Sequence, residues 1–470
     1  MAKENTAPLK GTRDFLPQDV RRREHVLAVV REVYGRYGFE PLETPAMERL
    51  ETLLGKYGEE GDQLIFRVLH RGAELGRALD KVRGRPAPGS AEEARAAFKR
   101  DELALGDSAL RYDLTVPLAR VVAEHQGELP RFFKRYQIQP VWRADRPAAG
   151  RFREFYQCDV DVVGSKDLVC EVEVASAVCE VLDRLGFDDY RVRLNHRALL
   201  RGMIEAAGVP LAREVEAITE LDKLGKVAPG EVRAALEARG VEATAAARLL
   251  EVVAGAGLGG AALLEALAGA VATSEAGRRG AAELRALLAL AAHAPCGRRL
   301  AFDPSLARGL SYYTGPVFEV QVPDLAGSLG GGGRYDDLIG MFLRQPLPAV
   351  GFSLGLERIL VVMAERRMFP ELSTAAQAMV LRLEEATTAE TLQVAAALRA
   401  AGIATELYPN VDKLGKQLQY AESRGARLVA FVGSREAEAG QVALKVMATQ
   451  AQHLVARDAL AATARELLAR

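Results

Sequence analysis

The chain has 470 residues, more than one hydrophobic core usually organises, so two or three domains are expected. Its 49% hydrophobic and 27% charged residues are typical of ordinary globular protein. A formal net charge of −1 argues against general coating of nucleic acid, which needs clustered Lys and Arg. Any contact with nucleic acid should therefore be local.

The cysteines and the hydropathy pattern predict a cytoplasmic protein. The four cysteines show no CxxC spacing and no histidine at zinc-finger distance, so neither a disulfide framework nor a zinc site is expected. The N-terminus is polar, and no run reaches the roughly 18 apolar residues of a membrane span. We expect neither export nor membrane insertion.

The first elements are a helix and an extended segment. Apolar residues recur at helical spacing over residues 21–37 and predict one amphipathic helix that ends at Gly38. Residues 40–45 are predicted to be extended, because proline disfavours helix in the residue before it. The polar stretch 71–108 contains GRPAPGS and predicts a helical or irregular excursion with a loop.

Residues 134–164 predict a β-hairpin with one polar face. Alternate positions of the first strand carry Arg135, Gln137, Gln139, Val141 and Arg143. Alternate positions of the second strand carry Arg153, Phe155, Gln157, Asp159, Asp161 and Val163. A solvated sheet face would also be polar. Here, however, an aromatic ring stands among charges and arginines flank the loop, which favours bidentate phosphate binding and stacking on a base.

Two later regions differ in composition. Residues 200–295 are rich in Ala, Leu, Glu, Gly and Arg with helical periodicity, which predicts an inserted helical domain. Its Ala/Gly-rich part could pass for a membrane or dimerisation segment, but dense glycines and flanking charges favour helix packing in a bundle. After Pro370, strand-like and helix-like segments alternate, which predicts a separate α/β domain with parallel strands.

Two glycine-bearing segments lie between these regions. ARGLSYYTGPVFEV is followed by the four consecutive glycines of GSLGGGGRYDD, a backbone that something must approach closely, although such turns are more often structural. Neither a Walker nor a Rossmann fingerprint occurs there. In AVGFSLGLERILVV, Arg358 stands at an apolar strand-to-helix junction, where it needs an anion or a ring to stack on.

Together these segments resemble the class II aminoacyl-tRNA synthetases, specifically the histidyl-tRNA synthetase family. GFEPLETPAME looks like motif 1, VWRADRPAAGRFREFYQCDVD like motif 2 and AVGFSLGLER like motif 3. RGLSYYTGPVFE and GGGGRYDDL look like histidine-specific signatures, and KGTRDFLP opens the chain as in the family. The resemblance implies an α+β fold in a homodimer with Pro45 near the interface. We expect a catalytic core at residues 1–199 and 296–368 with an antiparallel sheet, a helical insertion at 200–295 and a C-terminal α/β anticodon-binding domain at 377–470.

The resemblance also implies a reaction. L-Histidine and ATP would form histidyl-adenylate and pyrophosphate, and histidyl would then move to the 3′ end of tRNA(His). Arg143 matches an arginine that holds the α-phosphate and the substrate carboxylate, and Arg308 matches one that approaches from the other side to spread the transition-state charge. ATP in this class travels with Mg²⁺, so we expect Mg²⁺ without a metal cage made by protein alone.

The remaining site residues follow from the same resemblance. Further ATP contacts, to the adenine edge, the terminal phosphates, the adenine face and the γ-phosphate, match at Asp145, Arg151, Phe155 and Arg358. The acid and hydroxyl for the histidine ammonium, with a nearby amide, match at Asp113, Thr115 and Gln157. Residues around the imidazole match at Asp161, Tyr312 and Tyr313, where a carboxylate and a phenol can pair with both ring nitrogens.

The chain departs from the usual sequence pattern of the family at three places, and two alternative functions are left open. Ser311 replaces the usual acid of GLDYY, residues 449–452 read TQAQ where TGEQ is common, and Ala148 and Ala149 make the motif 2 loop alanine-rich. One rival is the non-catalytic regulatory subunit of ATP phosphoribosyltransferase, which lacks the anticodon-binding domain. The other is a free-standing ligase that charges a carrier protein or another acceptor.

Overall fold

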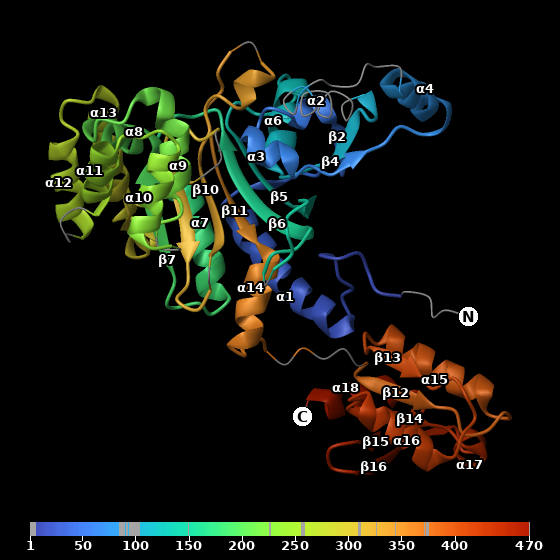
Figure 1. Cartoon of the computed structure of the whole chain (residues 1–470). Helices are drawn as coiled ribbons and strands as arrows, with labels where there is room; N and C mark the ends of the chain where they lie inside the picture. Colours follow the sequence, from blue (N-terminus) through green and yellow to red (C-terminus); the bar gives the residue numbers. More distant parts are fainter. Residues whose placement is uncertain are drawn as a thin grey trace. The chain divides into compact units, whose positions relative to one another are not determined.

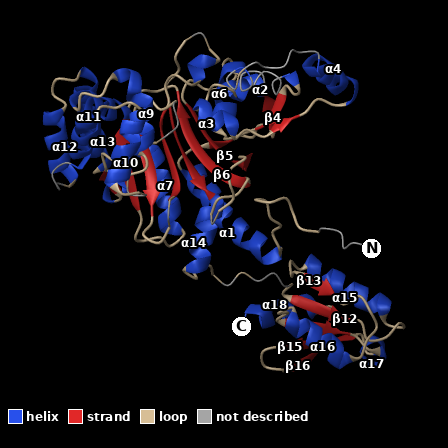
Figure 2. Cartoon of the chain, in the orientation of Figure 1, coloured by secondary structure: helices blue, strands red, loops and turns tan. Residues whose placement is uncertain are grey.

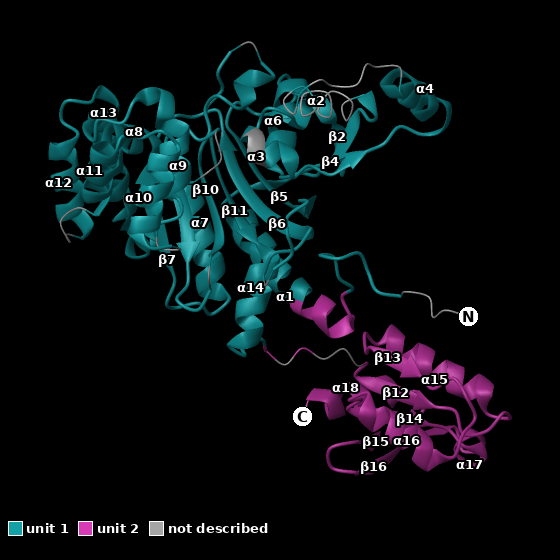
Figure 3. Cartoon of the chain, viewed as in Figure 1, with its two compact units in different colours: residues 1–14, 23–369 teal, residues 15–22, 370–470 magenta. Residues whose placement is uncertain are grey.

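The computed structural model describes residues 6–83, 90, 93, 104–148, 150–224, 227–254, 259–308, 312–325, 327–343, 345–370, 372 and 376–469. The chain divides into two compact units (Figure 3), residues 1–14 with 23–369 and residues 15–22 with 370–470. They are called the first and second unit below.

An eight-stranded sheet forms the centre of the first unit (Figure 1). In spatial order its strands are β1 (Glu40–Pro41), β5 (Phe133–Trp142), β6 (Glu154–Val163), β11 (Ala349–Gly355), β10 (Ser328–Arg334), β9 (Pro316–Gln321), β7 (Arg191–His196) and β8 (Leu300–Phe302). Pairing is antiparallel from β5 to β7, and only the edge strands β1 and β8 pair in parallel. The expected antiparallel sheet is confirmed.

The predicted hairpin is the pair β5 and β6. Its register places Arg135 opposite Asp161, Gln137 opposite Asp159 and Gln139 opposite Gln157. Because side chains alternate between the faces of a strand, these polar groups share one face. The same register continues through β11 and β10, where Asp161 neighbours Gly351, which in turn neighbours Gly333. These glycines therefore lie on the same face of the sheet as the charged side chains of the hairpin.

Apolar packing covers the other face of the sheet. Residues 23–36 of α1 (Pro17–Arg36), α7 (Val169–Arg184) and α14 (Leu356–Glu365) share one core cluster with the sheet (Figure 2). Helix α1 begins earlier than the predicted residue 21, because Pro17 can stand at the first helical position, where its missing N–H is not needed.

The described residues between β7 and β8 form helices. They are α8 (Arg197–Ala206), α9 (Glu214–Leu221), α10 (Pro229–Ala238), α11 (Ala243–Ala254), α12 (Gly260–Ala270) and α13 (Glu275–Ala291). A Cβ added at Gly202 of α8 would lie 2.4 Å from the Cα of Gly277 in α13, so these glycines let the two helices approach closely. In the part of the chain that the structure describes, no helix has the length and apolarity needed to traverse a bilayer.

A small sheet and short helices complete the first unit. Its strands are β2 (Met47–Arg49), β4 (Ser108–Leu110) and β3 (Arg67–Val68), and the helices are α2 (Leu50–Leu53), α3 (Gly58–Gln63), α4 (Gly72–Arg83) and α6 (Thr115–Glu124). Helix α4 belongs to the predicted excursion over 71–108, of which residues 84–89, 91, 92 and 94–103 lie outside the described residues.

The second unit is an α/β domain, as its alternating pattern predicted. Its sheet has the order β13 (Thr405–Leu407), β12 (Ala378–Leu381), β14 (Leu428–Phe431), β15 (Gln441–Val446) and β16 (Gln452–Ala456). The first three strands are parallel, and the last two pairings are antiparallel. Its helices are α15 (Thr388–Ala400), α16 (Leu414–Ser423), α17 (Ser434–Glu438) and α18 (Leu460–Ala469).

Candidate active site

A cavity of about 440 Å³ lies over the polar face of the large sheet. It brings together every residue that the sequence analysis named for binding or chemistry: Asp113, Thr115, Arg143, Asp145, Arg151, Phe155, Gln157, Asp161, Arg308, Tyr312, Tyr313 and Arg358. These residues come from the hairpin, from its loop, from the start of α6, from α14 and from the segment before β9. Ser311, the departure from the family signature, lies outside the described residues, as does Ala149.

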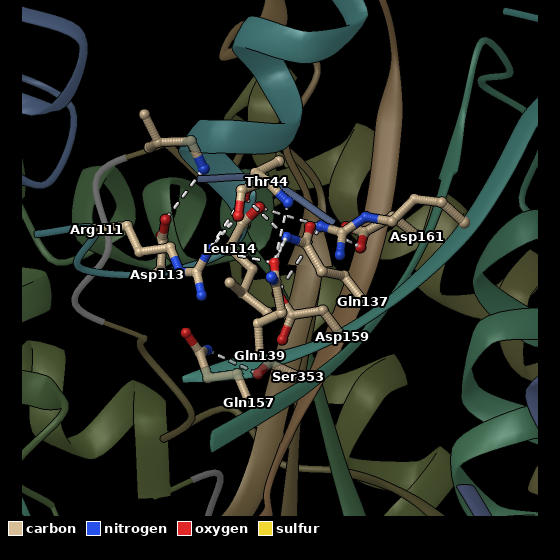
Figure 4. A network of polar contacts seen from close by, with 12 residues as sticks. Thr44, Arg111, Asp113, Leu114, Gln137, Gln139, Gln157, Asp159, Asp161 and Ser353 are labelled. Carbon is tan, nitrogen blue, oxygen red and sulfur yellow. Dashed lines mark hydrogen bonds and ion pairs between the residues drawn. The ribbon is translucent and has the colours of Figure 1, made fainter. Parts of the chain in front are cut away.

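Asp159 and Asp161, in the second half of β6, line one end of the cavity and belong to a buried charge cluster; Figure 4 shows these two side chains. The guanidinium of Arg135 is fully buried, and its Nη2 lies 2.9 Å from Asp161 Oδ2 and 3.9 Å from Asp159 Oδ2. The Tyr335 hydroxyl donates a hydrogen bond to the other oxygen of Asp161. Burial is the main cause that raises the pKa of both carboxyls, to about 7 for Asp159. One cation thus faces two carboxylates.

Glycines on the neighbouring strands give the cavity its room. A Cβ added at Gly331 would lie 1.3 Å from Arg308 Nη1, and one at Gly351 would lie 1.8 Å from Asp161 Oδ1. Neither glycine has a positive φ, so the requirement is for space rather than for a left-handed backbone. Arg308 Nη1 donates to the Phe318 carbonyl oxygen at 3.0 Å, which holds the guanidinium over Gly331.

Asp113 lies just before the N-terminus of α6. Its carboxylate accepts hydrogen bonds from the Tyr57 hydroxyl and from the backbone N–H of Val116, both at 3.0 Å. A helix N-terminus favours such an anion. Burial nevertheless raises the pKa of Asp113, and the hydrogen bonds and Arg143 offset part of that rise. A ligand ammonium could supply the missing positive charge.

Arginines gather at the opposite end of the cavity. Arg143 Nε donates to the Tyr112 carbonyl oxygen at 3.0 Å, and its guanidinium carbon lies 5.1 Å from the centroid of the Phe155 ring. Arg358 Nη1 donates to the Ser328 carbonyl oxygen at 2.6 Å. Burial lowers the pKa of Arg358, and the charges of Arg151 and Arg143 lower it further. Such mutually repelling guanidiniums suit a polyanion.

The N-terminal segment packs on the loop that carries Arg151. The backbone N–H of Arg153 donates to the Gly11 carbonyl oxygen at 2.8 Å, and Arg153 Nη1 donates to the carbonyl oxygen of Lys10 at 3.4 Å. The guanidinium of Arg13 lies 3.8 Å from the centroid of the Phe152 ring. Gly11 has a φ of 91°, and a Cβ there would meet the Arg153 side chain at 2.8 Å. The segment thus holds one side of the loop.

Several lining residues were not predicted from the sequence: Tyr57, Tyr112, Asp159, Asp222, Glu319 and Tyr335. Asp159 and Tyr335 had a signal, because Asp159 alternates with Asp161 along its strand and Tyr335 follows the glycine run. Tyr57 and Asp222 stand in segments without any chemical motif. Among the residues that the structure describes, no three His, Cys, Asp or Glu side chains gather closely enough to hold a metal ion.

Comparison with known proteins identifies the family. The family model described as histidyl-tRNA synthetase matches residues 11–80 and 87–359, and the one described as anticodon binding domain matches residues 377–467. A Porphyromonas gingivalis protein named histidine–tRNA ligase is 42% identical over 96% of this chain and 97% of its own length. A Gloeobacter violaceus protein of the same name is 40% identical over 95% of both chains.

A solved structure agrees. The crystal structure of histidyl-tRNA synthetase from Nostoc sp. PCC 7120 is 29% identical, covers 99% of this chain and 100% of its own, and superimposes with a TM-score of 0.76. Sequence, fold and the arrangement of the cavity therefore lead to one conclusion. The chain belongs to the histidyl-tRNA synthetase family.

Proposed function

We propose that the protein activates L-histidine with ATP and transfers the histidyl group to the 3′ end of tRNA(His). In the first step a histidine carboxylate oxygen attacks the α-phosphorus of ATP, and pyrophosphate leaves. In the second, a terminal hydroxyl of the tRNA attacks the acyl carbon, and AMP leaves. The observation that carries this proposal is one cavity lined by four arginines and by the buried carboxylates of Asp113, Asp159 and Asp161.

The arginines manage charge in the first step. A carboxylate that approaches an anionic phosphate is repelled unless cations stand between them, and guanidiniums fixed in a low-dielectric site stabilise the extra charge of the transition state. In our proposal Arg143 holds the α-phosphate and the substrate carboxylate, while Arg308 contacts the phosphate from the other side. The Phe318 carbonyl holds Arg308 in place before substrate binds.

The nucleotide would extend toward the arginine end. We assign Arg358 to the adenine and the γ-phosphate, Arg151 to the terminal phosphates, Asp145 to the adenine edge and the ring of Phe155 to the adenine face. The ring has the Arg143 guanidinium 5.1 Å from its centroid and lines the cavity, and an aromatic face can stack on a base. Arginines rather than a carboxylate cage surround this end, which fits Mg²⁺ that arrives on the ATP oxygens.

The amino acid would lie at the carboxylate end. We assign the ammonium to Asp113 and Thr115 with Gln157 nearby, because Asp113 is buried at a helix N-terminus and lacks a neutralising cation at hydrogen-bond distance among the described residues. The imidazole would lie against Asp161, Tyr312 and Tyr313. A site that pairs both ring nitrogens should reject apolar analogues by about 10⁴-fold.

The partners follow from the same proposal. Residues 377–467 would bind the anticodon arm of tRNA(His). We further propose a homodimer with Pro45 near its interface, since the neighbouring Met47 is 57% exposed. A cytoplasmic location is consistent with four cysteines that are all buried and unpaired by disulfides. Sedimentation of the purified chain would test the dimer.

The experiment that tests the function measures histidine-dependent exchange between ATP and pyrophosphate, followed by charging of tRNA(His). We expect both activities. Absence of exchange would support a non-catalytic regulatory subunit, and exchange without charging of tRNA would support a ligase for another acceptor. The match to an anticodon binding domain at residues 377–467 favours the tRNA reading over both rivals.

A further inference from the structure

We propose that Asp159 is a second specificity residue for the histidine ring, beside Asp161, and that the two carboxylates share the hydrogen bond from one ring N–H. This inference rests on the proposed function. It adds to the imidazole site a residue that the sequence analysis left unassigned.

The position of Asp159 points its side chain into the cavity. It precedes Asp161 by two residues on β6, so both carboxylates lie on the same face of the sheet. Asp159 is 2% exposed and lines the cavity together with Ser353, its neighbour on β11. Its Oδ1 is buried and accepts no hydrogen bond from the described residues. Because a buried carboxylate oxygen without a donor is costly, the donor is expected to come from the ligand.

The charges around the pair leave Asp159 the less satisfied of the two. Asp161 has the Arg135 guanidinium at 2.9 Å and accepts the hydrogen bond of Tyr335, whereas Asp159 has Arg135 at 3.9 Å and only the neutral hydroxyl of Ser353 to lower its pKa further. One fully buried guanidinium neutralises one carboxylate, so this end of the cavity keeps room for one more proton or N–H group. An imidazole, which carries ring N–H donors, has the chemistry that fits.

The ring is a better partner than the ammonium. Asp113 already provides one buried carboxylate at the start of α6 for the single positive charge of the ammonium. Asp159 stands instead beside Asp161, which Arg135 and Tyr335 contact and which lines the cavity with Tyr335. The charged or titratable groups that interact with Asp159 include Arg135, Asp161, Asp113, Tyr313, Tyr335, Tyr34 and Cys158.

The test is binding of L-histidine to the full chain, measured by calorimetry for the wild type and for Asp159→Asn. The substitution keeps the shape and removes the charge, and we expect a Kd about 10- to 100-fold weaker at pH 8, as for a lost charged hydrogen bond. Asp324→Asn is the matched control, since Asp324 pairs with Arg366 outside the cavity and should bind histidine like the wild type.

The pH dependence separates contact from mere structural support. Burial beside Asp161 raises the pKa of Asp159 to about 7, so a larger share of the ligand-free protein carries this charge at pH 8 than at pH 6. The ratio of Kd values between variant and wild type should therefore be smaller at pH 6 than at pH 8. A ratio that stays the same across this range would mean that Asp159 only supports the fold, and would overturn the proposal.

A second ligand locates the contact. Imidazolepropionate keeps the ring and the carboxylate but lacks the ammonium, so Asp159→Asn should weaken its binding by the same factor as that of histidine. A loss confined to histidine would assign Asp159 to the ammonium and refute the ring contact. Unchanged histidine binding in the variant refutes the inference alone, whereas a wild type that neither binds histidine nor supports exchange refutes the proposed function.

Discussion

Two strand pairs of one sheet build the same cavity by opposite means. The hairpin β5 and β6 supplies side chains, with Arg135, Asp159 and Asp161 on its buried face. The pair β10 and β11 supplies space, because Gly331 and Gly351 leave room for side chains that come from elsewhere. The first pair is destabilised because its charged side chains are buried. The second pair is destabilised because its glycines have no side chains to pack within the sheet. A functional face thus depends on missing side chains as much as on present ones.

The largest expected effect comes from the side chain that fills the space over Gly331. Arg308→Ala should lower the rate of histidine-dependent ATP–pyrophosphate exchange by about 1000-fold, as loss of a preorganised charge on the transition state does. Arg308→Lys should not restore the rate, because a point charge cannot replace the planar fork. Arg285→Lys, at an exposed ion pair of the helical insertion, is the control. A near-normal rate in Arg308→Lys would remove Arg308 from its proposed role.

The role of the glycines in β10 and β11 can be tested by adding one methyl group at Gly331. Gly331→Ala should lower the same exchange rate by about 100-fold, because its Cβ would displace the Arg308 guanidinium, and small misplacements of catalytic groups have costs of this size. Gly76→Ala meets no atom within 4 Å and should leave the rate unchanged. If Gly331→Ala remained folded and fully active, the glycines would be structural only.

The buried carboxyl of Asp159 in the hairpin can be tested through the pH dependence of the free energy of unfolding. Between the pKa of about 3.9 for an unfolded Asp and about 7 in the fold, the native state holds more protons than the unfolded chain at Asp159, so the free energy of unfolding falls as pH rises. Asp159→Asn removes this contribution. Its stability relative to the wild type, from urea unfolding of both proteins, should therefore increase from pH 5 to pH 8. A difference independent of pH would contradict the raised pKa.

The smallest expected effect lies at the N-terminal segment, which adds a third means of support. Gly11→Ala places a Cβ against Arg153 and strains a backbone with a φ of 91°. This strain should displace mainly the loop that carries Arg151. A cost of about 1 kcal/mol in ATP binding would raise the KM for ATP about fivefold. The KM for histidine should stay unchanged. Equal changes in both would show that the segment supports the whole cavity rather than its nucleotide end.

The two strand pairs also differ in how far the sequence predicts them. The hairpin was predictable because alternation along each strand is a local pattern, and its register agreed with the polar face. That Arg308 lies over Gly331 was not predictable from local pattern, because it depends on how the segment before β9 folds back onto the paired strands β9 and β10. Tyr57 and Asp222 were missed for the same reason, since they reach the cavity from segments without chemical motifs. In the second unit, the alternating pattern predicted the strands and helices up to β14 and the strand β15. It did not predict α17, β16 and α18.

The most direct test of the account is a crystal structure with a non-hydrolysable analogue of histidyl-adenylate. We predict the imidazole at the end formed by Asp159, Asp161 and Tyr335, and the phosphate between Arg143 and Arg308. The adenine should stack on Phe155. An analogue bound in the reverse orientation, or a phosphate that contacts neither Arg143 nor Arg308, would contradict the division of the cavity into a carboxylate end for the amino acid and an arginine end for the nucleotide.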